Sequence, residues 1–224
     1  MNSVAVVPIK DFWRAKTRLA PVLAPTERQR LARQMAGHVI MRLVQWLGPE
    51  RVRVAADGPR IARWAESRGC QAWLDPPFSG RSLGAGGVAS AEGAQSRLGT
   101  VVDCALTQAA AAGFHWAWVI MADLPALSPE DLSALEAARA GGADCVVAPD
   151  RCGEGTNALG LKLPATEPTA FGQKGSGVAH GQNCGESDRL IRVVQRSGLG
   201  LDVDHPTDLE AAEIPLAGLG CVAR

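Results

Sequence analysis

The sequence predicts an α/β protein with three layers, in which a mostly parallel central sheet is covered by helices on both faces. Short apolar runs typical of buried strands alternate along the chain with longer segments of helical periodicity. Such alternation places successive strands in parallel and their connecting helices on the sheet faces. Hydrophobic residues make up 46% of the 224 residues, enough for one buried core. Because no repeat or linker divides the chain, we expect a single domain over residues 1–224.

The first third of the chain contains three expected strands. The apolar run at residues 3–8 predicts the first, and residues 51–57 and 70–75 predict the second and third. A helix at residues 60–69 separates the last two and ends at a glycine. Between the first two strands, a longer helix is expected to follow Thr26, a favourable N-cap. Its apolar residues repeat every four positions and define one buried face: Leu31, Met35, Val39, Leu43 and Leu47.

Residues 76–99 interrupt this alternation with a long segment rich in glycine, serine and alanine. A segment of this length and composition predicts a flexible loop that is functional or disordered. A helix at residues 100–113 and a central strand at 115–122 follow it. The next helix is expected to start at Ser128 as N-cap, with Pro129 at its first position. Further strands are expected at residues 143–150, 158–164, 189–195 and 198–204, and a short closing helix at 205–212.

Composition excludes several classes of protein. Lysine plus arginine total 23 and aspartate plus glutamate also total 23, so general attraction to nucleic acid is not expected. No apolar run approaches the roughly 18–20 residues that span a bilayer, and no secretion signal is visible. The six cysteines lack the spacing of a zinc site. We therefore expect a cytoplasmic protein with no nucleic-acid or membrane partner, whose six tryptophans suit either a core or a homodimer interface.

A basic segment follows the first expected strand. The strand ends at Pro8, and Lys10, Arg14, Lys16 and Arg18 come shortly after it. Lysine and arginine neutralise the charge of a polyphosphate, and arginine can bind two of its oxygens at once. The segment therefore suits a nucleoside triphosphate. The alternative is a solvated basic turn whose aliphatic stems pack on the surface.

Three aspartates lie where expected strands end. Asp123 directly follows an apolar strand, where a carboxylate is either a natural ligand for magnesium or a turn former. Asp202 and Asp204 lie two apart on an expected strand, so both point to one face and repel unless a cation lies between them. The alternative is that Asp204 caps the closing helix while Asp202 is solvated. We favour a metal, because Asp123 could complete the cluster, and three acids with a basic loop suit phosphoryl transfer.

Two glycine-containing segments could bind an anion, at residues 153–157 and 171–180. Small residues let backbone amides approach an anion, although each segment could equally be an ordinary loop. The P-loop pattern is absent, and the GxGxxA match at residues 84–89 lacks the strand and helix that a dinucleotide site needs. The polar residues that the two segments offer are Thr156, Asn157, Lys174, Ser176 and His180.

Six segments of the chain, taken in order, resemble one known family. They are VPIKDFWRAKTRL (7–19), AADGPRIA (55–62), MADLPALSPEDL (121–132), APDRCGEGTNAL (148–159), FGQKGSGVAH (171–180) and GLGLDVDHPTDL (198–209). The family is that of the CofC/FbiD guanylyltransferases of deazaflavin coenzyme biosynthesis. The resemblance covers nearly the whole chain. It implies a single nucleotidyltransferase domain with the nucleotide-diphospho-sugar transferase fold, which is GT-A-like and MobA-like.

The resemblance also implies a reaction. GMP would pass from GTP to the phosphate of a small three-carbon acid, with release of pyrophosphate and with Mg²⁺ as the cofactor. An acceptor phosphate is already ionised at neutral pH, so no general base is required. The implied residues are, for magnesium and catalysis, Asp123, Asp202 and Asp204; for the nucleotide, Pro8, Lys10, Lys16, Arg18, Asp57 and Thr100; and for the acid, Thr156, Asn157, Gly172, Ser176 and Cys104.

The chain departs from the family pattern at two places. Members commonly carry GLNxAL before the third helix, where this chain has LGTVVDCAL at residues 98–106, and FGQKGS is one residue longer than the usual FGPGS. The first departure alters the pocket near Thr100, Asp103 and Cys104. It favours 3-phospho-D-glycerate as the acceptor over phosphoenolpyruvate and 2-phospho-L-lactate. Alternative functions are a sugar-phosphate or molybdopterin nucleotidyltransferase, or a catalytically silent nucleotide-binding module.

Overall fold

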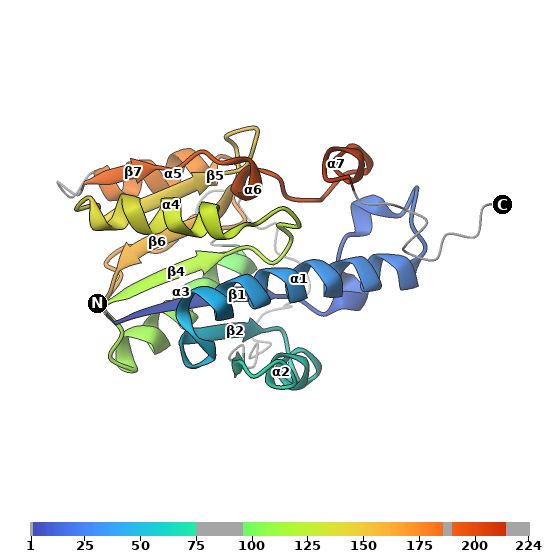
Figure 1. Ribbon diagram of the computed structural model, residues 1–224, viewed down its shortest axis with the longest axis horizontal. Helices are drawn as coiled ribbons and strands as arrows, with labels where there is room; N and C mark the ends of the chain where they lie inside the picture. Colours follow the sequence, from blue (N-terminus) through green and yellow to red (C-terminus); the bar gives the residue numbers. More distant parts are fainter. Residues whose placement is uncertain (1, 75–95, 186–189, 214–224) are drawn as a thin grey trace, which may run out of the picture.

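The computed structural model describes residues 2–74, 96–185 and 190–213, and it confirms the predicted α/β class (Figure 1). Its centre is a seven-stranded sheet with the order β3-β2-β1-β4-β6-β5-β7. Neighbouring strands are parallel except that β6 runs antiparallel to β4 and β5. The strands are β1 (Ser3–Ile9), β2 (Val52–Ala56), β3 (Gln71–Leu74), β4 (Trp116–Ile120), β5 (Cys145–Pro149), β6 (Thr156–Lys162) and β7 (Ile191–Val193).

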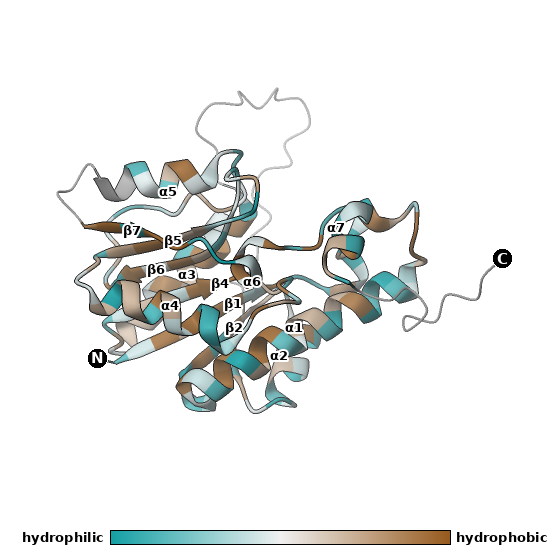
Figure 2. Ribbon diagram, turned by 45° about the horizontal axis from the view of Figure 1, so that its top comes forward, coloured by the Kyte–Doolittle hydropathy of each residue, from teal (hydrophilic) through white to brown (hydrophobic). Residues whose placement is uncertain are grey.

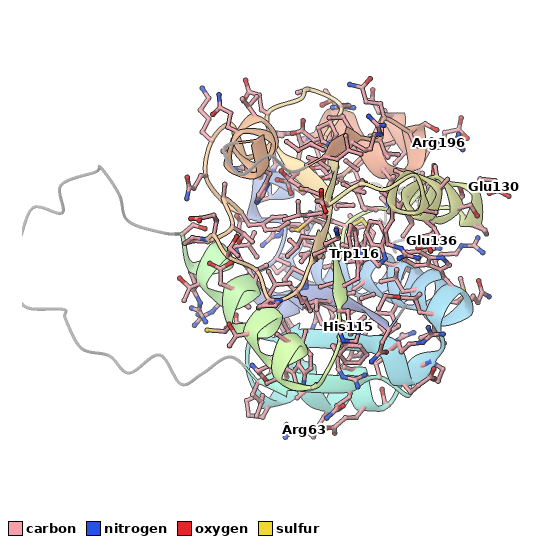
Figure 3. All side chains as sticks on the ribbon, turned by 90° about the vertical axis from the view of Figure 1, so that its left-hand side faces the viewer. Arg63, His115, Trp116, Glu130, Glu136 and Arg196 are labelled. Atoms are coloured by element: carbon pink, nitrogen blue, oxygen red, sulfur yellow. The ribbon has the colours of Figure 1, made fainter. Side chains whose placement is uncertain are left out.

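Helices cover both faces of the sheet, so the predicted three layers are present. The helices α1, α2 and α4 pack on one face, and α3 and α5 lie on the other. Figure 3 places Trp116 in the interior between these layers, whereas Arg63 and Glu130 project outward. The helices are α1 (Pro25–Leu47), α2 (Pro59–Glu66), α3 (Arg97–Ala111), α4 (Pro129–Ala140), α5 (Ser176–Gly185), α6 (Ser197–Gly200) and α7 (Pro206–Ala211).

The central strands contribute to two apolar cores, because successive side chains of a strand point to opposite faces. In β1, Ala5 and Val7 belong to the core beneath α1, and Val4 belongs to the core beneath α3. Figure 2 shows these apolar strands between helices whose outer sides are hydrophilic. Packing is tight where Trp118 of β4 pairs with Gly160 of β6: a Cβ at residue 160 would lie 2.2 Å from the indole ring.

Most of the expected elements are present, with small shifts at their ends. The predicted start of α4 at Ser128 is confirmed. The long helix, however, begins at Pro25 and takes Ala24 as its N-cap, so Thr26 is already helical. The Glu27 carboxylate accepts a hydrogen bond from the Ala24 N–H at 2.6 Å. A proline at the first position and a carboxylate in the first turn both favour this earlier start.

Two predictions for the last third of the chain are wrong. Residues 198–204 do not form a strand and pair with none of the seven strands of the sheet. They complete α6 and then form a segment held by other contacts: the Arg151 N–H donates to the Gly200 carbonyl at 2.8 Å. In addition, α5 begins at Ser176, within a segment predicted as a glycine-rich loop. Its small and polar residues carry little of the apolar periodicity that reveals a helix.

The glycine-rich segment at residues 76–99 falls mostly outside the described residues, as does the GxGxxA match at 84–89. Its end is described: Ser96 is the N-cap of α3, which begins at Arg97 rather than at residue 100. Within the described ranges, no helix combines the length and the apolar character needed to cross a membrane.

Candidate active site

A pocket of about 500 Å³ lies beyond the carboxyl ends of β1, β2 and β4, the edge of the sheet at which ligand binding was expected. Its wall is formed by the end of β1 and the loop after it, one face of α1, the end of β2, the first turns of α3 and the residues that follow β4, with single residues from later loops. Several of the residues predicted from the sequence therefore come together from distant parts of the chain. Those that line the pocket are Pro8, Lys10, Lys16, Arg18, Asp57, Asp123, Gly172 and Asp204.

The three predicted acids form one cluster. Asp123, Asp202 and Asp204 each offer a carboxylate oxygen, and these oxygens lie within 4.8 Å of one another. The Asp123 carbonyl accepts a hydrogen bond from the Val203 N–H at 3.3 Å, which joins the two acid-bearing segments. Val203 is fully buried in a small core that includes Leu209 of α7. The residues on either side of Val203 therefore share the opposite side, although the strand predicted to place them there is absent.

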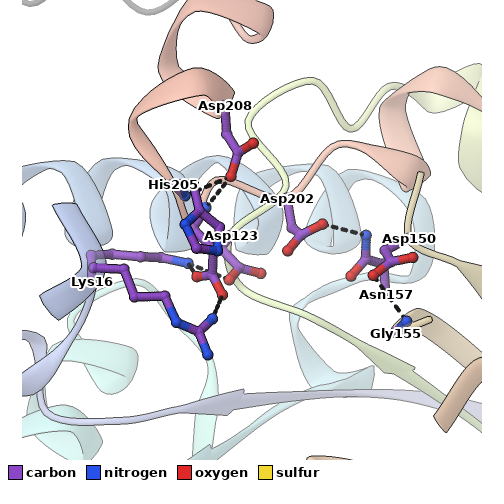
Figure 4. Close-up of polar contacts among 10 residues, drawn as sticks. Lys16, Asp123, Asp150, Gly155, Asn157, Asp202, His205 and Asp208 are labelled. Atoms are coloured by element: carbon purple, nitrogen blue, oxygen red, sulfur yellow. Dashed lines mark hydrogen bonds and ion pairs between the residues drawn. The ribbon is translucent and has the colours of Figure 1, made fainter. Parts of the chain in front are cut away.

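Lys16 forms ion pairs with two of these acids (Figure 4). Its Nζ contacts Oδ2 of Asp123 and lies 2.8 Å from Oδ1 of Asp204. The Arg18 guanidinium lies 2.7 Å from Oδ2 of Asp204. The Lys16 side chain is only 9% exposed, and its backbone has a φ of +54°, a left-handed conformation that is uncommon outside glycine. Such a conformation persists where surrounding contacts determine it, here the two ion pairs of a buried cation.

These ion pairs determine the charge of both partners. Burial lowers the pKa of Lys16, but the attraction of Asp123 and Asp204 outweighs it and holds the pKa above its ordinary value. Burial raises the pKa of Asp204, but the charges of Lys16 and Arg18 outweigh it and hold the pKa below its ordinary value. Lys16 and Asp204 are therefore both charged at neutral pH.

Asp202 differs from its neighbours because it has no ion pair with any described residue. Its Oδ1 accepts a hydrogen bond from Asn157 Nδ2 at 3.2 Å, and burial together with the charge of Asp123 raises its pKa. Oδ1 of Asp123 is buried and has no hydrogen-bond partner within the described ranges. A hard cation satisfies both groups, since magnesium prefers oxygen ligands. The chemistry of this donor set thus fits a magnesium ion held by Asp123, Asp202 and Asp204.

Two residues predicted to bind the acid, Thr156 and Ser176, are buried and do not line the pocket. Thr156 Oγ1 lies 3.1 Å from Ser176 Oγ and 2.9 Å from Nδ1 of His180. Because β6 is antiparallel to β4, its first residues, Thr156 and Asn157, lie at the carboxyl edge of β4. The turn before Thr156 is closed by Asp150, whose carboxylate accepts the N–H of residue 155 at 2.9 Å (Figure 4).

The wall contributed by α3 differs from the one predicted. Arg97, Leu98 and Val101 line the pocket, and Thr100 and Cys104 do not. Thr100 and Cys104 were expected there from the resemblance to the family, whereas in α3 the residues that reach the pocket are Arg97, Leu98 and Val101. The Thr100 hydroxyl instead donates a hydrogen bond to a carbonyl one turn earlier, at 3.2 Å.

Arg97 is the charged residue of the pocket that sequence analysis missed. Its guanidinium pairs with the Asp57 carboxylate after β2, and the other oxygen of Asp57 accepts the Asp11 N–H at 3.4 Å. Ser96, a good N-cap, was the signal that could have placed Arg97 at the start of the helix. Gly172 also lines the pocket, with a φ of +75°, and a Cβ there would lie 2.5 Å from Ser96 Oγ. The backbone conformation and the close approach of Ser96 therefore both favour glycine at this position.

A basic loop that faces converging carboxylates at the open edge of such a sheet suits nucleotidyl transfer, and comparisons with known proteins give the same class. Residues 28–170 match the model of the MobA-like NTP transferase domain. A nucleotide-diphospho-sugar transferase structure from Desulfovibrio desulfuricans shares the fold, with a TM-score of 0.66 at 16% identity over 94% of this chain and 86% of that one. The protein is a nucleotidyltransferase.

Relatives of similar length identify the family. The chain is 34% identical to phosphoenolpyruvate guanylyltransferase of Sphaerobacter thermophilus, over 94% of this chain and 92% of that protein. It is 35% identical to the enzyme of the same name from Chloroflexus aggregans, over 93% and 97%. It is 31% identical to 2-phospho-L-lactate guanylyltransferase of Methanothermobacter thermautotrophicus, over 100% and 89%. The chain belongs to this guanylyltransferase family, and the resemblance inferred from its motifs is confirmed.

Proposed function

We propose that the protein transfers GMP from GTP to the phosphate of a small three-carbon acid, with release of pyrophosphate, in deazaflavin coenzyme biosynthesis. The observation that carries the proposal is the convergence of Lys16 and Arg18 from the loop after β1 on Asp123 and Asp204 at the pocket. The names of the relatives support guanylyltransfer and, among acceptors, phosphoenolpyruvate and 2-phospho-L-lactate. The cytoplasmic location and a homodimer stay predictions from the sequence.

The reaction requires alignment more than proton transfer. An ionised oxygen of the acceptor phosphate forms a bond to the α-phosphorus of GTP, and the bond from that phosphorus to the bridging oxygen of the β-phosphate breaks. The electron pair leaves on pyrophosphate, so atoms and charge balance without a base. Lys10, Lys16 and Arg18 would bind the triphosphate and stabilise the leaving pyrophosphate. Most of the acceleration would then come from positioning and electrostatics.

The acids would complete the site. A magnesium ion, when bound by Asp123, Asp202 and Asp204, supplies positive charge against the developing negative charge of the phosphates. Asn157 would orient Asp202 through its side-chain amide. Pro8 and Asp57, which line the pocket, would contact the nucleotide, and Thr100 lies one helical turn from that wall.

The acid would bind on the α3 and α5 side of the pocket. Gly172 lines the pocket, and Thr156 and Ser176 would offer their hydroxyl groups to the acid from the same side of the sheet as α5. Cys104 lies in α3, in the segment whose sequence favours 3-phospho-D-glycerate. The names of the relatives and this segment therefore support different acceptors.

Pyrophosphate release by the purified protein tests the reaction and the acceptor together. GTP and magnesium would be combined in parallel with phosphoenolpyruvate, 3-phospho-D-glycerate and 2-phospho-L-lactate, and ATP would replace GTP as the nucleotide control. We expect release with GTP and at least one of the three acids. If folded protein that binds GTP released no pyrophosphate with any of the three acids, the proposed reaction would be rejected.

A further inference from the structure

A compact polar cluster lies in the core on the α3 and α5 side of the sheet. Thr156, Ser176 and His180 are 6%, 3% and 3% exposed. Thr156 Oγ1 lies 2.9 Å from His180 Nδ1 and 3.1 Å from Ser176 Oγ. The His180 ring also packs against Phe171, with ring centroids 4.8 Å apart. His180 thus connects the start of β6, the start of α5 and the loop that leads to the pocket.

The backbone determines which ring nitrogen of His180 carries the proton. The Ala170 N–H donates a hydrogen bond to Nε2 at 2.9 Å, so Nε2 must be an unprotonated acceptor. The proton of the neutral ring is therefore on Nδ1, which faces Thr156 Oγ1 and the Ser176 backbone carbonyl, so Nδ1 can only donate to Thr156. Burial lowers the pKa of His180 to about 4, which keeps the ring neutral at physiological pH.

Because Nδ1 of His180 donates rather than accepts, one hydroxyl proton of the Thr156–Ser176 pair has no acceptor among the described residues. Thr156 and Ser176 carry one hydroxyl proton each, and only one of the two can lie in the hydrogen bond between them. His180 accepts neither, because its only acceptor nitrogen is already used by Ala170. The other proton has no acceptor among the described residues. The pair is therefore a hydrogen-bond donor that awaits an acceptor.

The place of this donor points to an anionic ligand. Thr156 and Asn157 are successive residues of β6, so their side chains lie on opposite faces of the sheet: Asn157 holds Asp202 of the acid cluster, and Thr156 faces α5. Ser176 opens α5, and the N-terminus of a helix favours negative charge. Gly172, four residues before Ser176, lines the pocket itself. An anion bound against Gly172 would therefore approach the N-terminus of α5, where Ser176 lies.

We propose that His180 is a positioning residue: it fixes the Thr156–Ser176 pair as a hydrogen-bond donor to the carboxylate of the acid acceptor. The carboxylate is the group concerned, because the phosphate of the acceptor must meet the α-phosphate of GTP at the acid cluster. This proposal rests on the proposed function. Its structural premise, the Nδ1 proton, can be measured without turnover.

The first experiment is kinetic. His180→Phe keeps a ring against Phe171 and removes the hydrogen bonds, and His180→Asn retains a polar group near the position of Nδ1. We expect His180→Phe to raise the KM for the acid roughly ten-fold, the effect of one hydrogen bond to a charged group, with the KM for GTP unchanged. His180→Asn should recover part of this loss. Equal changes in both KM values, or no change in either, would overturn the proposal.

A matched control and a coupling test sharpen the result. His38→Asn removes another histidine hydrogen bond, from Nε2 to the Leu127 carbonyl at 2.8 Å, on the α1 side of the molecule. It should leave the KM for the acid unchanged. Because His180 acts through Thr156, the double variant Thr156→Val/His180→Phe should bind the acid no more weakly than Thr156→Val alone. Additive losses would contradict this dependence.

The second experiment is NMR on the wild-type protein with ¹⁵N-labelled histidine, which stays informative if a variant fails to fold. We expect His180 to be protonated at Nδ1 and its signals to shift when phosphoenolpyruvate is added without GTP. Protonation at Nε2 would overturn the proposal. A shift in protein that turns over none of the acids would reject the proposed function and leave the positioning role. Turnover without any shift of the His180 signals would reject the positioning role and leave the proposed function.

Discussion

The residues on the two sides of the pocket are held in place by different kinds of interaction. On the acid-cluster side, Lys16 and Arg18 hold Asp204 through ion pairs, and the Asp204 side chain remains 36% exposed. On the other side, Thr156 and His180 are nearly inaccessible and connected by neutral hydrogen bonds. The Arg18–Asp204 pair lies near solvent and can exchange partners readily, whereas a buried neutral network is costly to rearrange. The first side suits charged groups that change partners when phosphates bind. The second suits a rigid binding site that keeps its shape when the acid binds.

The largest effect should follow from a change to the acid cluster. Asp204→Asn keeps the size of the side chain and removes the charge that Lys16 and Arg18 face. We expect a loss of roughly 10²–10³-fold in kcat/KM with the fold retained, as seen by circular dichroism. Glu66→Gln, an exposed change at the end of α2, is the charge-matched control and should keep its activity. A folded Asp204→Asn variant of normal activity would exclude Asp204 from catalysis.

Lys16 tests whether charges on the acid-cluster side change partners. In the absence of nucleotide, Lys16→Met frees Asp123 and Asp204, so Mn²⁺ should bind roughly three- to ten-fold more tightly by calorimetry. Turnover should nevertheless fall by about ten-fold or more, since the cation for the triphosphate is gone. Lys162→Met removes a lysine that pairs with Asp144 on the sheet surface and should change neither value. Weaker Mn²⁺ binding by Lys16→Met would contradict the exchange.

Two glycines test whether the backbone on the proposed acid-binding side of the pocket is rigid. Gly172 and Gly175 have φ values of +75° and +76°, so alanine at either position should cost about 1 kcal/mol in unfolding free energy. Only at Gly172 does a Cβ meet another atom, Ser96 Oγ at 2.5 Å. Gly172→Ala should therefore also raise the KM for the acid, by roughly ten-fold, as displacement of the pocket wall predicts. Equal KM values for the two variants would show that the backbone on this side adapts.

The smallest effect concerns stability and pH. The pKa of Asp202 is raised in the folded protein by burial and by Asp123, so the ionised carboxylate opposes folding at neutral pH. Without metal, Asp202→Asn should raise the Tm by a few degrees at most and still lower activity. The gain should disappear as the pH falls below the ordinary aspartate pKa of 3.8, where Asp202 is protonated in both states. A lower Tm for Asp202→Asn at neutral pH would refute this assignment of charge.

His180, which contacts the Thr156–Ser176 pair, shows what periodicity cannot predict. Residues 171–180 were noticed for their glycines, but the role of His180 depends on the Ala170 N–H and on Thr156, 24 positions earlier. Ser96 as an N-cap could have placed Arg97 at the start of α3, but no local pattern predicts its partner Asp57, 40 positions away. Local patterns report which backbone conformation a segment prefers. They carry no information about which distant group will face a given side chain.

The sequence by itself determined the layers, the basic loop after β1 and the position of Asp123 after β4, because burial and backbone preference act over a few neighbouring residues. Only the tertiary structure decided that β6 runs antiparallel, which brings Thr156 and Asn157 to the carboxyl edge of β4. It also decided that Asp202 and Asp204 reach Asp123 from an unpaired segment held by Asn157 and Arg151. These contacts join segments far apart in the chain, and their geometry arises only when the sheet order is complete.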